Sequence, residues 1–170
     1  MGFVLTEEQQ ILRDSAKGFI AEKSPVTELR RLRDSNDENG FDTGLWSQMA
    51  EMGFAGIIIP EEYGGAGFGY RGLGLVLEEA GRTLAASPLV STSLLCASAL
   101  LIGGSEDQKK ALLPEIASGN LVMALAMDEG AHHNPANIEA SAAKDGDGYV
   151  LNGTKSFVLD GHVAGKLIVA

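Results

Sequence analysis

Several features that would point to other protein classes are scarce in this sequence of 170 residues. Cys96 is the only cysteine, so no internal disulfide can form. This fits a reducing compartment, and the apolar run around Cys96 predicts a small buried residue rather than a nucleophile. Basic residues are outnumbered, and the net charge of −10 argues against a nucleic-acid surface. The local cluster of Arg30, Arg31 and Arg33 is interpreted as a solvated helix face.

Targeting and membrane signals are also missing. The N-terminus lacks the basic region and apolar core of a signal peptide, so we expect a bacterial cytoplasmic protein. Residues 83–105 carry no charge and are long enough to cross a bilayer, but they contain Pro88 and several Ser, Thr and Gly. We therefore predict a helix over residues 89–102 that is buried on all sides within a helical domain.

Histidines and paired acids are present, but without the spacing of a metal or catalytic centre. The side chains of His132 and His133 would diverge, and no third ligand follows at a suitable distance, so we expect a surface loop and no metal site. Glu78 and Glu79 are consecutive acids of the kind that is usually solvated, and Arg82 lies within pairing distance. No Ser-His-Asp arrangement can be argued.

One glycine motif suggests a dinucleotide loop. Gly67, Gly69 and Gly72 match G-x-G-x-x-G after a short apolar run. Residues 60–63 separate that run from the glycines, however, and no acid follows at about 20 residues to bind a ribose. We expect a loop that bends back over the helices.

Helical spacing dominates the first 120 residues. Thr6 with Gln9, and Ser105 with Gln108, form capping boxes that predict two helix starts. Apolar periodicity and helix breakers predict the other helices. These are a short basic helix over residues 27–33, a helix that stops at Gly53 and a helix over residues 73–84; the helix after Ser105 should end at Gly119.

The pattern changes to that of strands after residue 120. Residues 145–148 (DGDG) and 152–153 (NG) are hairpin signals. Candidate strands cover residues 121–127, 138–144, 149–151, 156–159 and 166–170. The fold class is therefore α+β, with an all-helical domain over residues 1–120 and the beginning of an antiparallel β-barrel-like domain over residues 121–170. The apolar run at the end would be an unpaired edge strand, so we expect the front part of a larger enzyme.

Five stretches carry a family resemblance. They are residues 6–9 (TEEQ), 60–67 (PEEYGGAG), 77–82 (LEEAGR), 104–114 (GSEDQKKALLP) and 148–155 (GYVLNGTK). In this order they resemble the acyl-CoA dehydrogenases over essentially the whole chain, and the last stretch is the most specific.

The resemblance implies a fold and a reaction. Family members have a helical domain, a middle β domain and a C-terminal four-helix bundle, which the 170 residues do not include, and FAD lies between the last two. A carboxylate removes the α-proton of an acyl-CoA substrate while the β-hydrogen passes as hydride to the flavin. Electrons then pass to an electron-transfer flavoprotein. We expect the catalytic base beyond Ala170 and a homodimer or tetramer, with a hetero-oligomer as the alternative.

The resemblance also implies two flavin-contacting segments. Where the family shows LTEPGAGSD, residues 126–134 read AMDEGAHHN, so Met127 and His133 replace a Thr and a Ser whose hydroxyls contact the ligands. Where the family shows WITNG, residues 157–161 read FVLDG, so Leu159 cannot donate a hydroxyl. The implied cofactor-binding residues are Ala126, Met127, His133, Phe157, Val158 and Leu159, and the implied acyl-pocket residues are Ser91, Leu94 and Leu95.

Two other hypotheses stay open, and the missing hydroxyls favour the first of them. The chain can be a non-catalytic, flavin-poor subunit of a hetero-oligomeric acyl-CoA dehydrogenase. It can also be a related flavin oxidase or monooxygenase, which oxygen consumption without an acceptor protein would identify.

Overall fold

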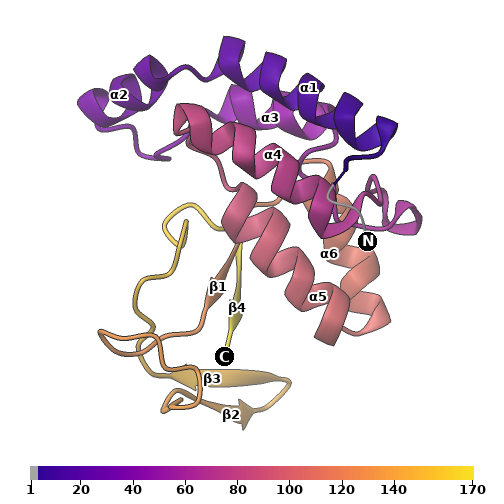
Figure 1. The fold of residues 1–170 in the computed structure, drawn as a ribbon. Coiled ribbons are helices and arrows are strands. Elements are labelled where there is room, and N and C mark those ends of the chain that lie inside the picture. Colours follow the sequence, from indigo (N-terminus) through magenta and orange to yellow (C-terminus); the bar gives the residue numbers. More distant parts are fainter. Residues whose placement is uncertain (1–3) are drawn as a thin grey trace.

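The computed structural model describes residues 4–170, which form a helical body followed by a small, open set of strands (Figure 1). The first helices are α1 (Glu7–Lys23), α2 (Val26–Ser35) and α3 (Thr43–Glu51). A short 3₁₀ turn, η1 (Glu61–Tyr63), precedes α4 (Gly69–Thr83). The π-helical η2 (Leu89–Cys96), α5 (Ala97–Gly103) and α6 (Glu106–Ala117) complete the body.

The helix starts follow from their caps. The Thr6 side chain accepts from the Gln9 amide and the Gln9 side chain accepts from the Thr6 amide, and Ser105 and Gln108 repeat the arrangement. These reciprocal bonds satisfy amides that would otherwise lack partners at the first turn. Both predicted capping boxes are thereby confirmed.

The core lies between α1, α3, α4, α6 and the turn at residues 54–59. Phe54, Ile57 and Ile59 of that turn are fully buried, and the rings of Phe19 and Phe54 meet edge to face with centroids 5.9 Å apart. Cys96 is buried in the same core, and burial raises the pKa of its thiol to about 11. The prediction that Cys96 is a small buried residue is confirmed.

The glycine-rich loop returns to the turn before it. The amides of Ala66, Gly67 and Phe68 donate to the carbonyls of Gly56, Ile59 and Ile57. The expected loop that bends back is thus confirmed, but α4 begins at Gly69, four residues before the expected Leu73. Gly72 permits this earlier start, since a Cβ there would lie 2.6 Å from Cβ of Phe68.

The helix expected to be buried on all sides is buried on one face only. Leu89, Cys96 and Leu100 are in the core, whereas Val90 and Leu95 are exposed and Ile102 is 83% exposed. Eight residues form the π-helical segment η2, whose wider turns shift the apolar positions away from α-helical spacing. None of the helices within residues 4–170 is both long enough and apolar enough to span a membrane.

Two separate strand pairs follow the helices. β1 (Met123–Ala126) pairs in parallel with β4 (Lys166–Val169), and β2 (Ser141–Asp145) pairs antiparallel with β3 (Gly148–Asn152). The DGDG hairpin is confirmed, with Asp145 opposite Gly148. This is a helical domain followed by the start of a sheet domain, and the four strands found in the described part of the chain do not close into a barrel.

Two strand predictions are wrong. Residues 156–159 form no strand because the backbone enters the left-handed region at Phe157 and again at Asp160. Asn152-Gly153 makes no hairpin, because Gly153 instead lets the chain pass close to Ala140.

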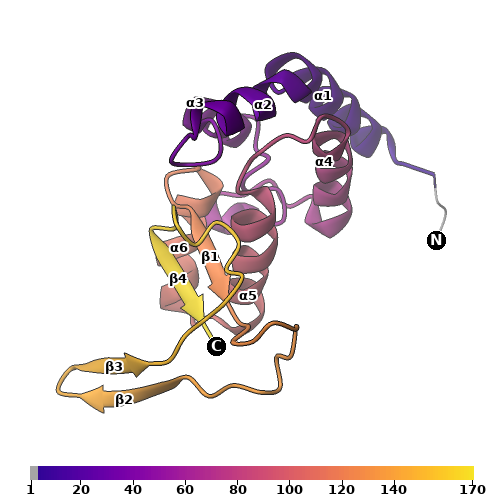
Figure 2. The same ribbon diagram turned by 90° about the vertical axis from the view of Figure 1, so that its left-hand side faces the viewer.

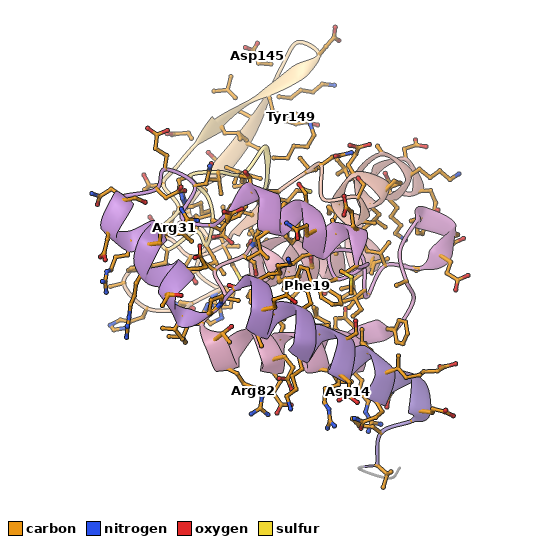
Figure 3. The ribbon with its side chains drawn as sticks, turned by 90° about the horizontal axis from the view of Figure 1, so that it is seen from above. Asp14, Phe19, Arg31, Arg82, Asp145 and Tyr149 are labelled. Atoms are coloured by element: carbon orange, nitrogen blue, oxygen red, sulfur yellow. The ribbon has the colours of Figure 1, made fainter. Side chains whose placement is uncertain are left out.

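The β2–β3 hairpin projects away from the helical body, as Figure 2 shows. Every residue of both strands is exposed. Seen from above in Figure 3, Asp145 and Tyr149 lie on this projection, while Arg31 and Arg82 lie on the surface of the helices. The surface arginines are paired with acids, Arg31 with Glu28 and Asp42, which fits the solvated face expected from the sequence.

Candidate functional site

Where the chain leaves β1, the first segment implied to contact a flavin lies beside the residues that directly precede the second. The Ser156 amide donates to the Asp128 carbonyl at 2.7 Å, and Lys155 Nζ donates to the Met127 carbonyl at 3.1 Å. Residues 127–128 and 155–156 therefore run side by side although 28 positions separate them in the sequence. Farther along the chain, β4 pairs in parallel with β1, and this pairing also keeps the two parts of the chain close together.

An ion pair between Glu129 and Lys155 holds this junction together. Lys155 Nζ lies 2.7 Å from Glu129 Oε1, and the two side chains are only 9% and 13% exposed. Glu129 also accepts from the backbone amides of Glu139 at 2.7 Å and Ala140 at 2.9 Å. The carboxylate thus joins the end of β1, the start of β2 and the segment after β3.

These donors favour the ionised carboxylate. The hydrogen bond from Lys155, followed by those from the two amides, lowers the pKa of Glu129 to about 2. Charge-assisted hydrogen bonds of this kind are stronger than neutral ones. The bonds to Glu129 therefore hold the segment after β1 in place against residues 139–140 and Lys155.

A second, exposed pair lies on the loop after Asp128. His133 Nδ1 is 3.0 Å from Asp128 Oδ2, and the Asn134 amide donates to Oδ1 at 3.1 Å. Hydrogen bonding from His133 lowers the pKa of Asp128. Both His132 and His133 are exposed, which confirms the predicted surface loop.

The second segment implied to contact a flavin is a turn rather than a strand. Phe157 has φ 54° and Asp160 has φ 56°, and the ring of Phe157 is 81% exposed. Leu159 is also exposed and Val158 is half-buried. The turn is closed by the Gly161 amide, which donates to the Val158 carbonyl at 3.1 Å.

The implied acyl-pocket residues lie on η2, beside both segments. Ser91 is fully buried, Leu94 packs against the core and Leu95 is exposed. The Ser91 hydroxyl lies 2.5 Å from Asp160 Oδ2. Its neighbour Thr92 bonds the backbone of β1 at Met123. The structure therefore brings η2, the start of β1 and the turn at residues 157–161 together.

Sequence reasoning missed three residues of this cluster. Glu129 stands where the family pattern shows a proline, and Asp160 stands where it shows an asparagine, so the resemblance gave neither a role. Lys155 was quoted within the GYVLNGTK motif without a partner. Acids at positions where the family has uncharged residues were the signal that could have identified Glu129 and Asp160.

Comparisons with known proteins agree with this architecture. Residues 6–120 match the family described as "Acyl-CoA dehydrogenase, N-terminal domain". Mitochondrial isovaleryl-CoA dehydrogenase from Bos taurus is 35% identical over 168 residues, which are 97% of this chain and 39% of that protein. The chain therefore spans well under half the length of this relative.

Two solved structures are similar in both fold and sequence. An acyl-CoA dehydrogenase from Geobacillus kaustophilus superposes with a TM-score of 0.83 and 31% identity, over 100% of this chain and 44% of that one. A chain of the ChsE4–ChsE5 complex from Mycobacterium tuberculosis gives a TM-score of 0.83 and 30% identity, over 98% of this chain and 44% of that one. With the matched domain, the shared fold and more than 30% identity across nearly its whole length, the chain belongs to the acyl-CoA dehydrogenase family.

Proposed function

We propose that this chain is part of an FAD-dependent acyl-CoA dehydrogenase that converts an acyl-CoA thioester to a 2-enoyl-CoA. The observation that carries the proposal is the apposition of residues 127–128 with residues 155–156, directly before the turn at residues 157–161, fixed by the 2.7 Å bond from the Ser156 amide to the Asp128 carbonyl. The two segments that resemble the family's flavin contacts can bind one flavin only if the fold brings them close together. Here one backbone bond and one buried ion pair keep them in register.

The side chains at this junction fit a flavin, with fewer hydroxyl donors than the family pattern has. Phe157 presents an exposed ring that can stack on an aromatic ligand, and Leu159 adds apolar surface. Ala126, Met127 and Val158 would contribute backbone and apolar contacts, and His133 would lie towards the phosphates. When bound, FAD supplies the hydride acceptor, and the chain's residues position it.

The remaining parts of the proposal rest on the family. We assign the catalytic base to a carboxylate beyond Ala170 and the electron acceptor to an electron-transfer flavoprotein. Leu94 and Leu95 would border the acyl chain. We propose residues 1–120 and 121–170 as the two domains, a homodimer or tetramer as the assembly, and the bacterial cytoplasm as the location; the matched bovine relative is mitochondrial.

The first test is flavin content and its reduction by substrate. The complete polypeptide should purify with FAD absorbance, and a fatty acyl-CoA should bleach that absorbance under anaerobic conditions. A colourless protein that does not take up added FAD would refute the proposal. Oxygen consumption without an acceptor protein would instead favour the oxidase or monooxygenase.

A flavin-poor subunit of a hetero-oligomer is the second candidate. It is favoured by Met127, His133 and Leu159, which offer no hydroxyl at the three positions where the family pattern has one. One matched structure is a complex of two differently named chains, ChsE4 and ChsE5. Purification with a partner that carries all the flavin would support this candidate, whereas an active homo-oligomer would exclude it.

A further inference from the structure

The turn at residues 157–161 has an unusual backbone that needs support from elsewhere. Phe157 and Asp160 both adopt left-handed conformations, which are uncommon for residues other than glycine. Two backbone bonds close the turn, from the Gly161 amide to the Val158 carbonyl at 3.1 Å and from the Val163 amide to the Asp160 carbonyl at 3.2 Å. Neither bond connects the turn to the helical body.

The Asp160 side chain makes that connection. Its Oδ2 lies 2.5 Å from the hydroxyl oxygen of Ser91, whose other neighbour is the Pro88 carbonyl at 3.2 Å. Ser91 is fully buried, and the hydroxyl has one proton, which it donates to the nearer carboxylate. A hydrogen bond to an ionised group is the stronger kind.

Ser91 is itself fixed relative to β1. The next residue, Thr92, accepts from the Met123 amide at 3.0 Å and donates to the Met123 carbonyl at 2.9 Å. Consecutive residues of η2 therefore hold the strand that leads to Ala126 and the turn that carries Phe157. The π-helical form of η2 is relevant here, because such segments are frequent at functional sites.

We propose that Ser91 is a positioning residue for the cofactor: through Asp160 it sets the placement of Phe157, Val158 and Leu159 relative to β1, whose first residue, Met123, is bonded to the neighbouring Thr92. This rests on the proposed function, since it assumes that these residues face a flavin. It gives Ser91 a role different from that of a pocket residue in contact with the acyl chain.

The chain offers a matched control on the same helix. Ser93 is also fully buried, but its hydroxyl has no hydrogen-bond partner among residues 4–170. Ser91→Ala and Ser93→Ala therefore remove the same atom from equally buried sites on η2, and only the first breaks a bond to the turn. Asp160→Asn is the conservative partner variant, because its amide oxygen can still accept from Ser91.

The experiment measures FAD dissociation and the visible circular dichroism of bound FAD in the complete protein. Ser91→Ala and Asp160→Ala should each weaken FAD binding about tenfold and change the flavin dichroism, and the double variant should be no worse than either. Ser93→Ala should stay within about twofold of the parent. Asp160→Asn should weaken FAD binding less than Asp160→Ala, because its amide oxygen still accepts from Ser91 but without the charge. Equal effects of Ser91→Ala and Ser93→Ala, or additive effects in the double variant, would overturn the proposal.

Hydrogen exchange in flavin-free protein tests the same link without the cofactor. Ser91→Ala should speed exchange of the Gly161 and Val163 amides about tenfold, as expected when a bond that holds the turn is lost, and Ser93→Ala should not. If the parent protein binds no FAD, the proposed function fails together with the cofactor role of Ser91, yet faster exchange would still establish the link to the turn. If the parent binds FAD and neither readout changes in Ser91→Ala, only the positioning role fails.

Discussion

At the residue scale, the buried pair of Glu129 and Lys155 is the feature that most affects stability near the candidate site. Three donors surround the Glu129 carboxylate, and Lys155 also bonds the Met127 carbonyl. Removing one partner of such a pair leaves the other buried and uncompensated, which is usually worse than lacking the pair altogether. Glu129→Gln should therefore be costly, because it leaves the Lys155 ammonium without its carboxylate.

The pH dependence of folding should reveal this pair. The pKa of Glu129 is lowered from 4.5 to about 2 in the folded chain, so its stabilising effect is complete above pH 4.5. It should fade as the pH falls from 4.5 towards 2, because in this window the unfolded chain takes up the proton while the folded chain, with its lower pKa, does not. Urea unfolding of the parent and of Glu129→Gln at several pH values measures this. We expect Glu129→Gln to be less stable at pH 7 and the difference to shrink below pH 4.5.

Glu115→Gln is the control for this measurement, since Glu115 is exposed on α6 and takes part in none of the ion pairs found in residues 4–170. Its difference from the parent should be small and should not vary with pH in the same way. A Glu129→Gln variant that behaves like Glu115→Gln would contradict the role given to the pair. The pKa of Asp128 is also lowered, so the stabilising effect of its carboxylate should fade in the same way as the pH falls. Asp128 is present in both variants, so its contribution is the same in each.

At the element scale, the end of α6 shows how one glycine fixes the packing of two helices. Gly119 has φ +76°, and a Cβ there would lie 2.6 Å from Cβ of Ala50 on α3. The indole nitrogen of Trp46 donates to the Gly119 carbonyl at 2.9 Å. The glycine thus permits the left-handed turn, the close approach to α3 and the bond from the tryptophan.

Two glycine substitutions test this account, because they should change the free energy of unfolding in opposite directions. Gly119→Ala should destabilise the fold by roughly 2–4 kcal/mol, because it adds both backbone strain and overpacking. Gly74→Ala should stabilise it by about 0.5–1 kcal/mol, because Gly74 is exposed within α4 with no atom of the described residues within 4 Å of an added Cβ. Chemical denaturation of both variants gives the free energies, and equal effects would contradict this account of Gly119.

The elements that sequence reasoning predicted well are those with local causes. The capping boxes at Thr6 and Ser105 and the DGDG hairpin depend on residues within a few positions of one another, so the sequence alone determines them. The errors have distant causes. Residues 156–159 were predicted as a strand but lead into the turn at residues 157–161, whose Ser91 partner lies 69 positions away. The exposed face of η2 and α5 was missed, because an uncharged run does not reveal which side meets the core.

At the scale of the whole molecule, the chain divides into a packed helical body and a hairpin without a core. The fully buried side chains, such as Ile20, Met49 and Leu113, all lie in the body or on β1. The β2–β3 hairpin has no buried residue, and a two-stranded hairpin is marginal in water by itself. The hairpin is held at its base, where the Glu129 carboxylate accepts hydrogen bonds from the amides of Glu139 and Ala140.

Hydrogen exchange of residues 1–170 should therefore show two very different stabilities. Amides of Ile20, Met49 and Leu73, in buried helices, should exchange only through global or near-global unfolding, whereas those of β2 and β3 should exchange at least about 100-fold faster through local opening. Glu129→Gln should speed exchange at the base of the hairpin further, and Glu115→Gln should not. Equal protection of hairpin and helices would mean that the hairpin packs against another surface, and a dependence of that protection on protein concentration would identify the surface as a second copy of the chain.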